Sequence, residues 1–366
     1  MNRIEIEPEL FKWARERSFL SVEDLEKKFP KYALWEKGEE HPTLKQLEDL
    51  ARKTLTPLGY FFLPEPPDDK LPIPDFRTVK DSGLNRPSPN LLETVQAMQR
   101  RQNWMRDYLI EQGCEKLPFM GASTLSDKPK EVACDIRKVL SRDPGWAEKH
   151  STWEDALRSL RDAVDNVGIM IVINGVVGNS TSRKLDTEEF RGFILVDDYA
   201  PLVFVNGTDA KGAQMFTIAH ELAHLWLGET GVFNLNALQP SNNEVEKFCN
   251  KVAAEFLIPE EEIKKSWTEA ESTGAPFQAL ARQFKVSPIV AARRALDVNL
   301  IDRDAFFAFY AKYQEDDRRR KAKAGGGGDF YLTQNNRIGV HFGLSVIRAA
   351  KEGHLQYHDA YQLTGL

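Results

Sequence analysis

Two histidines and a glutamate stand close together in the segment from Met215 to Gly228. His220, Glu221 and His224 fit the pattern H-E-x-x-H, which binds zinc when it lies on a helix. Residues four apart share one helix face, so the two imidazoles point the same way. Glu221 is rotated by about 100° from His220 and can border a metal ion without coordinating it. Zinc held by two histidines and a carboxylate keeps one position open for water, and an adjacent carboxylate can take its proton. Those are the parts that peptide-bond hydrolysis needs.

The residues around this motif are mostly apolar, which predicts a buried helix. They are Phe216, Ile218, Ala219, Leu222, Ala223, Leu225, Trp226 and Leu227. Buried imidazoles beside a buried carboxylate are costly unless something satisfies them, and a metal ion does. The alternative is a structural cluster of polar side chains without a metal. The motif and its surroundings favour a zinc site.

A third protein ligand is expected on the helix predicted at residues 243–259. The longer pattern H-E-x-x-H-x-x-G-x-x-H fails, because Leu227 and Thr230 occupy its glycine and histidine positions. A downstream glutamate is the natural substitute. Helical periodicity places Glu246 on one flank of the helix's apolar face and Glu244 and Glu255 on the other. Periodicity alone leaves both flanks open.

The segments before the motif predict a small sheet. Residues 168–177 are rich in β-branched side chains and predict a buried strand, residues 190–197 and 201–206 predict two further strands, and residues 197–201 make a hairpin connection. A mixed or antiparallel sheet thus precedes the metal helix. Zinc peptidases commonly present an edge strand to an extended substrate, and the sequence leaves open which strand that is.

Residues 1–63 predict a small all-α domain, with one helix near Leu10–Arg17, one capped at Ser21 and one capped near Thr43. Trp35-Glu-Lys-Gly38, followed by Pro42-Thr-Leu and Gln46-Leu-Glu-Asp-Leu-Ala51, resembles an XRE-type, Cro/repressor-like helix-turn-helix domain.

The recognition helix of this helix-turn-helix-like domain is abbreviated. Only Glu26–Leu34 separates Leu25 from Trp35, and Pro30 stands in the middle of that segment. We therefore expect this module to contact proteins, with operator DNA as the alternative.

Two motifs together resemble the ImmA/IrrE family of metallopeptidases. The first is Phe216-Thr-x-Ala-His-Glu-Leu-Ala-His224, and the second is Glu246-x-x-x-Asn250-x-x-Ala-Ala-Glu-Phe-Leu-Ile-Pro259. The resemblance covers residues 168–300 and implies a mostly helical, zincin-like fold in which Glu246 completes the zinc site. Cys249, which lies on the apolar face, is expected to be a buried structural cysteine.

Residues 275–297 are again helix-turn-helix-like and resemble the helical extension that this peptidase family carries. We expect Arg293 and Arg294 to form a solvated face or to pair with acidic neighbours. Contact with nucleic-acid phosphates is the alternative.

The predicted fold class is α+β, a mostly helical zincin-like peptidase with a small β-sheet that follows a small all-α domain. The expected segments are 1–63, helix-turn-helix-like; 64–77, a proline-rich linker; 78–314, the peptidase domain with a helical lead-in (78–165) and a catalytic core (166–300); 315–328, a charged and glycine-rich linker; and 329–366, a tail that docks on the core.

Composition excludes several classes of protein. A net charge of −6 over 366 residues argues against a protein that coats nucleic acid. Cys114, Cys134 and Cys249 are odd in number and include no C-x-x-C pair, which predicts free thiols in a reducing compartment. The chain starts without a signal-peptide pattern and has no apolar run of membrane-spanning length, so we expect a cytoplasmic protein.

Together these features predict a zinc-dependent endopeptidase of regulatory type. His220, His224 and Glu246 would hold Zn²⁺, although manganese and iron accept the same ligands, and Glu221 would be the general base. The resemblance implies a protein substrate, a helix-turn-helix repressor being typical. The alternative is an antitoxin or transcriptional regulator that uses the peptidase fold as a scaffold for a toxin or repressor.

Overall fold

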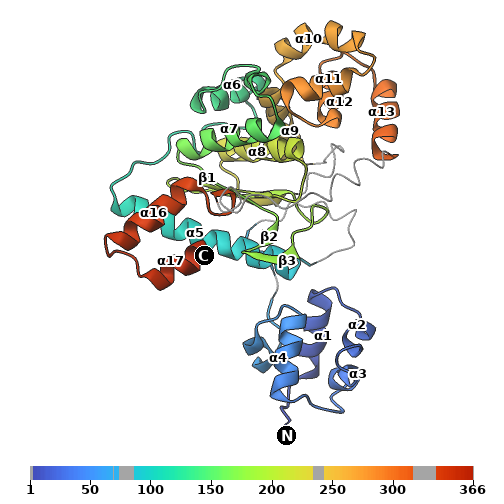
Figure 1. Ribbon diagram of the computed structural model, residues 1–366, viewed down its shortest axis with the longest axis vertical. Helices are drawn as coiled ribbons and strands as arrows, with labels where there is room; N and C mark the ends of the chain where they lie inside the picture. The colour runs from blue at the N-terminus through green and yellow to red at the C-terminus, as the bar shows by residue number, and fades with distance from the viewer. Residues whose placement is uncertain (1–2, 69, 74–85, 234–242, 316–334, 366) are drawn as a thin grey trace. The chain divides into compact units, whose positions relative to one another are not determined.

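The computed structural model describes residues 3–68, 70–73, 86–233, 243–315 and 335–365 (Figure 1). The chain divides into two compact units, Met1–Pro72 with Val79–Gln96, and Ile73–Thr78 with Ala97–Leu366. Among the described residues, no helix combines the length and apolar character that a membrane crossing requires. Apart from Glu315, which ends a helix, the predicted linker at 315–328 lies outside the described residues, and so does part of the one at 64–77.

Short helices make up the first unit. They are α1 (Pro8–Arg17), α2 (Val22–Glu26), α3 (Tyr32–Glu36), α4 (Leu44–Lys53) and the 3-10 helix η1 (Leu58–Phe62). The starts of α2 and α4 agree with the predicted caps, because each has a capping box. The Ser21 side chain accepts a hydrogen bond from the Asp24 N–H, and the Thr43 side chain accepts one from the Gln46 N–H. These bonds satisfy donors that the first turn of a helix leaves unpaired.

The short helix α3 contributes two aromatic side chains to the core of the first unit. The Tyr32 and Trp35 side chains are buried, and their rings pack against Phe11 of α1. The Tyr32 hydroxyl also donates to the Phe11 carbonyl oxygen at 2.7 Å. Residues 1–63 carry 11 basic and 12 acidic side chains, so this unit has no excess of positive charge to attract DNA phosphates.

A mixed four-stranded sheet lies in the second unit, in the order β1-β5-β4-β6. β1 and β5 are parallel, while β4 is antiparallel to both of its neighbours. The strands are β1 (Met170–Asn174), β2 (Val176–Val177), β3 (Ser180–Lys184), β4 (Gly192–Leu195), β5 (Leu202–Asn206) and β6 (Gly231–Phe233), with β2 and β3 in a separate sheet. The predicted α+β class and the antiparallel connection between β4 and β5 are confirmed.

The buried strand predicted over residues 168–177 is confirmed at residues 170–174, but its continuation to residue 177 is wrong, because the chain leaves the sheet at Gly175. The Asn174 side chain accepts a hydrogen bond from the Val176 N–H at 3.2 Å, and a local turn of this kind interrupts a strand. The sequence predicts neither β3 nor β6. The sequence of β3 does not alternate between apolar and polar residues. β6 begins at Gly231, and a glycine there predicts a break in secondary structure instead of a strand.

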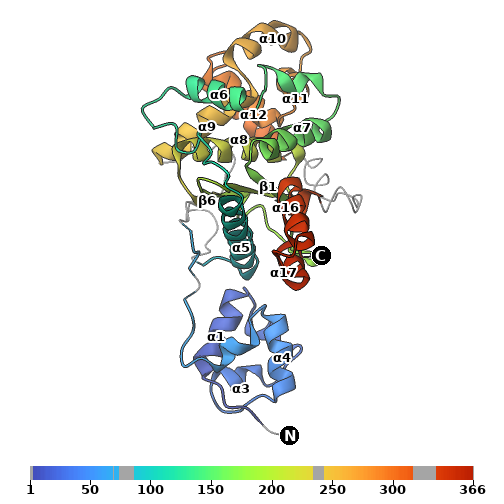
Figure 2. The ribbon, with the colours of Figure 1, turned by 90° about the vertical axis from the view of Figure 1, so that its left-hand side faces the viewer.

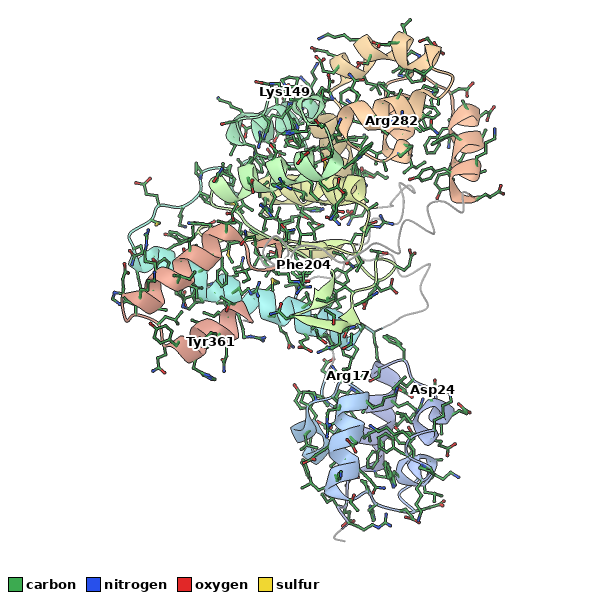
Figure 3. The ribbon with its side chains drawn as sticks, in the orientation of Figure 1. Arg17, Asp24, Lys149, Phe204, Arg282 and Tyr361 are labelled. Carbon is green, nitrogen blue, oxygen red and sulfur yellow. The ribbon has the colours of Figure 1, made fainter. Side chains whose placement is uncertain are left out.

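The remaining described helices are α5 (Pro89–Glu111), α6 (Pro129–Val139), the 3-10 helix η2 (Trp146–Lys149), α7 (Trp153–Asn166), α8 (Lys211–Leu227), α9 (Glu244–Leu257), α10 (Glu260–Ser272), α11 (Pro276–Phe284), α12 (Pro288–Asp297), α13 (Arg303–Glu315), α16 (Val340–Lys351) and α17 (Tyr357–Thr364). Helices α7 and α8 cover one face of the sheet (Figure 1). The C-terminal part of α5, with α16, lies on the other face (Figure 2). Phe204, labelled in Figure 3, lies in β5, where its ring stacks on Phe193 of β4 with centroids 4.8 Å apart.

A buried arginine holds the C-terminal helices. Arg101 of α5 donates to the carbonyl oxygens of Arg337, Leu363 and Thr364 at 2.7, 2.8 and 3.2 Å. The carbonyl groups of Leu363 and Thr364 close the last turn of α17, where a helix leaves acceptors unpaired. Burial lowers the pKa of the guanidinium to about 10, so it stays charged at pH 7.

Arg101→Ala is expected to release α16 and α17, because it leaves three carbonyl acceptors, one buried and two partly buried, without their donor. We expect a loss of about 3 kcal/mol in the free energy of unfolding, measured by chemical denaturation. Limited proteolysis within residues 338–366 should also become faster. Arg100→Ala removes the exposed neighbouring arginine and should change stability by less than about 0.5 kcal/mol. Equal stability and proteolysis of the two variants would contradict this account of Arg101.

Candidate metal centre

The H-E-x-x-H residues lie on helix α8, which is buried on every side. All residues of Gln214–Trp226 are buried, as their apolar character predicts. The helix ends before Gly228, whose φ of 72° is the left-handed conformation that glycine adopts without strain. The N–H groups of Gly121 and Ser123 donate to carbonyl oxygens of the last turn at 3.0 and 2.8 Å, so a separate loop caps the helix.

His220, His224 and Glu246 meet in one buried cluster. The two Nε2 atoms lie 3.0 Å apart. Carboxylate oxygens of Glu246 lie 3.3 Å from His220 Nε2 and 3.4 Å from His224 Nε2. A tetrahedral zinc ion with ligands at about 2.0–2.1 Å sets its ligand atoms about 3.3 Å apart. These three donor atoms therefore have the chemistry and the spacing of a zinc ligand set.

The structure distinguishes the three glutamates of α9 that periodicity leaves open. Glu244 is exposed and pairs with Lys247 at 2.8 Å. Glu255 is buried, and its carboxylate pairs with Arg294 of α12. Of the three, only Glu246 joins the two histidines. The residue that the family resemblance selects is also the one that the packing of α8 on α9 brings to the cluster.

The remaining residues singled out on α9 and α12 have structural contacts. Arg293 pairs with Asp297 at 3.0 Å, and Arg294 pairs with Glu255, so both arginines have the acidic neighbours that we expect. Arg294 is buried, which leaves it no surface for a phosphate. Cys249 is also fully buried, and burial raises the pKa of its thiol well above the usual value.

Glu221 lies beside the cluster and against the sheet. It is completely buried, and neither carboxyl oxygen has a hydrogen-bond partner among the described residues. Burial raises its pKa well above the usual value, and the negative charge of Glu246 raises it further. Its Oε1 lies 3.0 Å from the place that a Cβ would take on Gly192 of β4. A buried acid with a shifted pKa and no partner is typical of a group kept for proton transfer.

The ligand groups have protonation states that suit a cation. Burial lowers the pKa of His224 to about 4, so its ring is neutral at pH 7 and has a lone pair to donate. Burial works against ionisation of Glu246, but the neighbouring His220 and His224 rings outweigh it and lower the pKa to about 2. The cluster thus combines a carboxylate with a neutral imidazole at physiological pH.

Fold and site together define an α+β protein with a buried His-His-Glu group that could hold a metal ion. Residues 164–296 match the family model Peptidase_M78, described as the IrrE N-terminal-like domain. This match includes the whole cluster and supports a peptidase of the ImmA/IrrE type. Residues 338–366 match a domain of unknown function, DUF8813. Neither matched segment includes residues 1–63, so the XRE-type resemblance stays a prediction. No curated protein matches the chain.

Glu246→Ala is expected to weaken zinc binding by more than about 100-fold, because it removes a ligand. Loss of a residue that only orients a ligand already lowers metal affinity about 10- to 100-fold. Competition with a chromogenic chelator measures the affinity. Glu244→Ala, on the same helix and exposed, is the matched control and should bind zinc like the wild type. Unchanged zinc affinity in Glu246→Ala would remove this residue from the ligand set.

Glu255→Ala is expected to lower stability, because it leaves the buried Arg294 guanidinium without its acidic partner. Breaking a buried ion pair from one side costs about 3–5 kcal/mol in the free energy of unfolding. Denaturation in urea measures the loss. Glu244→Ala, which breaks only an exposed pair, should cost less than about 1 kcal/mol. A Glu255→Ala protein as stable as this control would show that the buried pair does not hold α9 against α12.

Proposed function

We propose that this chain is a zinc-dependent endopeptidase of regulatory type that cleaves a partner protein. The observation that carries the proposal is the buried His220–His224–Glu246 group with Glu221 beside it, inside the segment that matches a peptidase family model. Ionisable groups gathered out of water are costly unless a charge of opposite sign pairs with them. A divalent cation provides that charge.

Each side chain of the cluster has one task in this proposal. His220, His224 and Glu246 would hold the ion. A bound zinc ion would lower the pKa of a water molecule and would polarise the scissile carbonyl. Glu221 takes a proton from the attacking water and then gives it to the nitrogen of the leaving amine. The buried surroundings of Glu221 favour its protonated form, which suits the second of these two steps.

The proposed substrate is an extended segment that adds to one edge of the sheet by main-chain hydrogen bonds. Among the strands of the described residues, β1 and β6 lie at the edges of the sheet. The start of α16 lies against β1, since a Cβ on Gly339 would stand 3.3 Å from the Ile171 carbonyl oxygen. β6 pairs with β4, whose Gly192 lies against Glu221. These contacts favour β6 as the edge that presents the substrate.

The proposed partner is a helix-turn-helix repressor, which is the substrate class that the family resemblance implies. The first unit would contact this partner. Its large apolar side chains Phe19, Leu55 and Phe62 are exposed, so a protein partner could cover them. The acidic and basic side chains of this unit balance, which also favours a protein partner over DNA.

Glu221→Gln is expected to keep zinc and to lower cleavage about 100- to 10,000-fold, because the amide cannot accept the proton of water. Candidate repressors are incubated with zinc-loaded protein, and the fragments are identified by mass spectrometry. Glu244→Gln is the control and should cleave like the wild type. Equal cleavage by Glu221→Gln would contradict the mechanism. A zinc-loaded wild type that binds a repressor or toxin and leaves it intact would support the scaffold function instead.

A further inference from the structure

Gly192 stands at a position of β4 where no side chain fits. A Cβ built on it would lie 2.6 Å from Thr217 Cγ2, 2.9 Å from the Phe204 carbonyl oxygen and 3.0 Å from Glu221 Oε1. Non-bonded heavy atoms prefer separations of about 3.5–4.0 Å. A methyl group at this position would therefore displace at least one of these neighbours.

The backbone gives no separate reason for a glycine here. The φ of Gly192 lies outside the left-handed region, and the residue pairs with Val205 of β5 and Phe233 of β6. It is thus an ordinary strand residue with neighbours on both sides. Glycine inside a strand lowers stability, because it adds backbone entropy to the unfolded chain and packs no side chain. Glycine is therefore needed at position 192 because a side chain there would take space that neighbouring atoms occupy.

The same face of β4 indicates what that space contains. Side chains alternate along a strand, so Gly192 and Ile194 face the same way. Ile194 is fully buried in the core cluster that includes α8. At Gly192 the corresponding space contains side-chain atoms of Thr217 and Glu221, both on α8.

We propose that Gly192 is a positioning residue for the general base. Glu221 has no hydrogen-bond partner among the described residues that would orient its carboxyl. Its orientation therefore depends on the packing around it, which includes the bare backbone of β4 at Gly192. The Thr217 side chain, one turn earlier on α8, lies against the same position of β4. The catalytic meaning of this contact rests on the proposed function, while the placement of the carboxyl does not.

The experiment compares Gly192→Ala with Gly212→Ala in the full-length protein. A Cβ on Gly212 would lie 2.9 Å from the backbone nitrogen of Ser287, so this control is similarly crowded. It lies about 13 Å along α8 from Glu221, at 1.5 Å per residue. The double variant Gly192→Ala/Thr217→Ser is the rescue, because it removes the methyl group nearest to the new side chain.

Gly192→Ala is expected to lower kcat about 100-fold, the cost of misplacing a catalytic group by about 1 Å. KM and zinc affinity should stay within about threefold of the wild-type values, because the chemical step is what depends on this carboxyl. The double variant should regain at least about tenfold in kcat. Gly212→Ala should melt at a lower temperature and keep its kcat. An unchanged kcat in Gly192→Ala would overturn the proposal.

Crystal structures of the wild type and of Gly192→Ala separate this inference from the proposed function. A Glu221 carboxyl that moves away from β4 by about 1 Å or more supports the positioning role, whatever the protein cleaves. If β4 moves to accommodate the new methyl group while Glu221 stays in place, the positioning role of Gly192 is overturned, even if the protein is an active peptidase. A wild type that neither binds zinc nor cleaves would contradict only the proposed function.

Discussion

The contact between α8 and α9 gathers two imidazoles and two carboxyl groups where water is excluded, and the second unit is built around that contact. Burial opposes charge on these groups, since it lowers the pKa of His224 and raises that of Glu221. A divalent cation reverses this cost, because it pairs with the Glu246 carboxylate and takes the lone pairs of the imidazoles. The same exclusion of water that makes the cluster costly without a cation makes it suited to controlled proton transfer.

The cluster depends on contacts far from the metal ligands. A loop at Gly121 and Ser123 caps the last turn of α8, and Asn243 caps the first turn of α9 at 2.9 Å. Near its other end, α9 is fixed by the buried pair of Glu255 with Arg294. Because interiors are close-packed, a change at any of these places shifts the helices that present the ligands. Two residues of α8 and one of α9 can therefore share one ion only while the ends of both helices are held.

Local signals made much of this structure predictable. The spacing of His220 and His224, with apolar residues around them, predicts the buried helix, and capping residues predict the starts of α2 and α4. Periodicity could not choose Glu246, because a helical wheel relates a side chain to its own helix and not to the helix that packs against it. The break at Gly175 depends on a side-chain turn at Asn174. The contact of Gly192 with Glu221 could not be predicted either, since the side chains that it accommodates, Thr217 and Glu221, lie 25 and 29 residues further along the chain.

Anomalous diffraction from zinc-loaded crystals tests the central claim most directly. Data collected on either side of the zinc absorption edge locate the ion without reference to any enzymatic assay. We predict one strong peak about 2.0–2.2 Å from His220 Nε2, from His224 Nε2 and from a carboxylate oxygen of Glu246, with Glu221 outside this ligand set. Zinc bound elsewhere, or no peak at the cluster in crystals soaked with zinc, would contradict the claim that these three residues bind the ion.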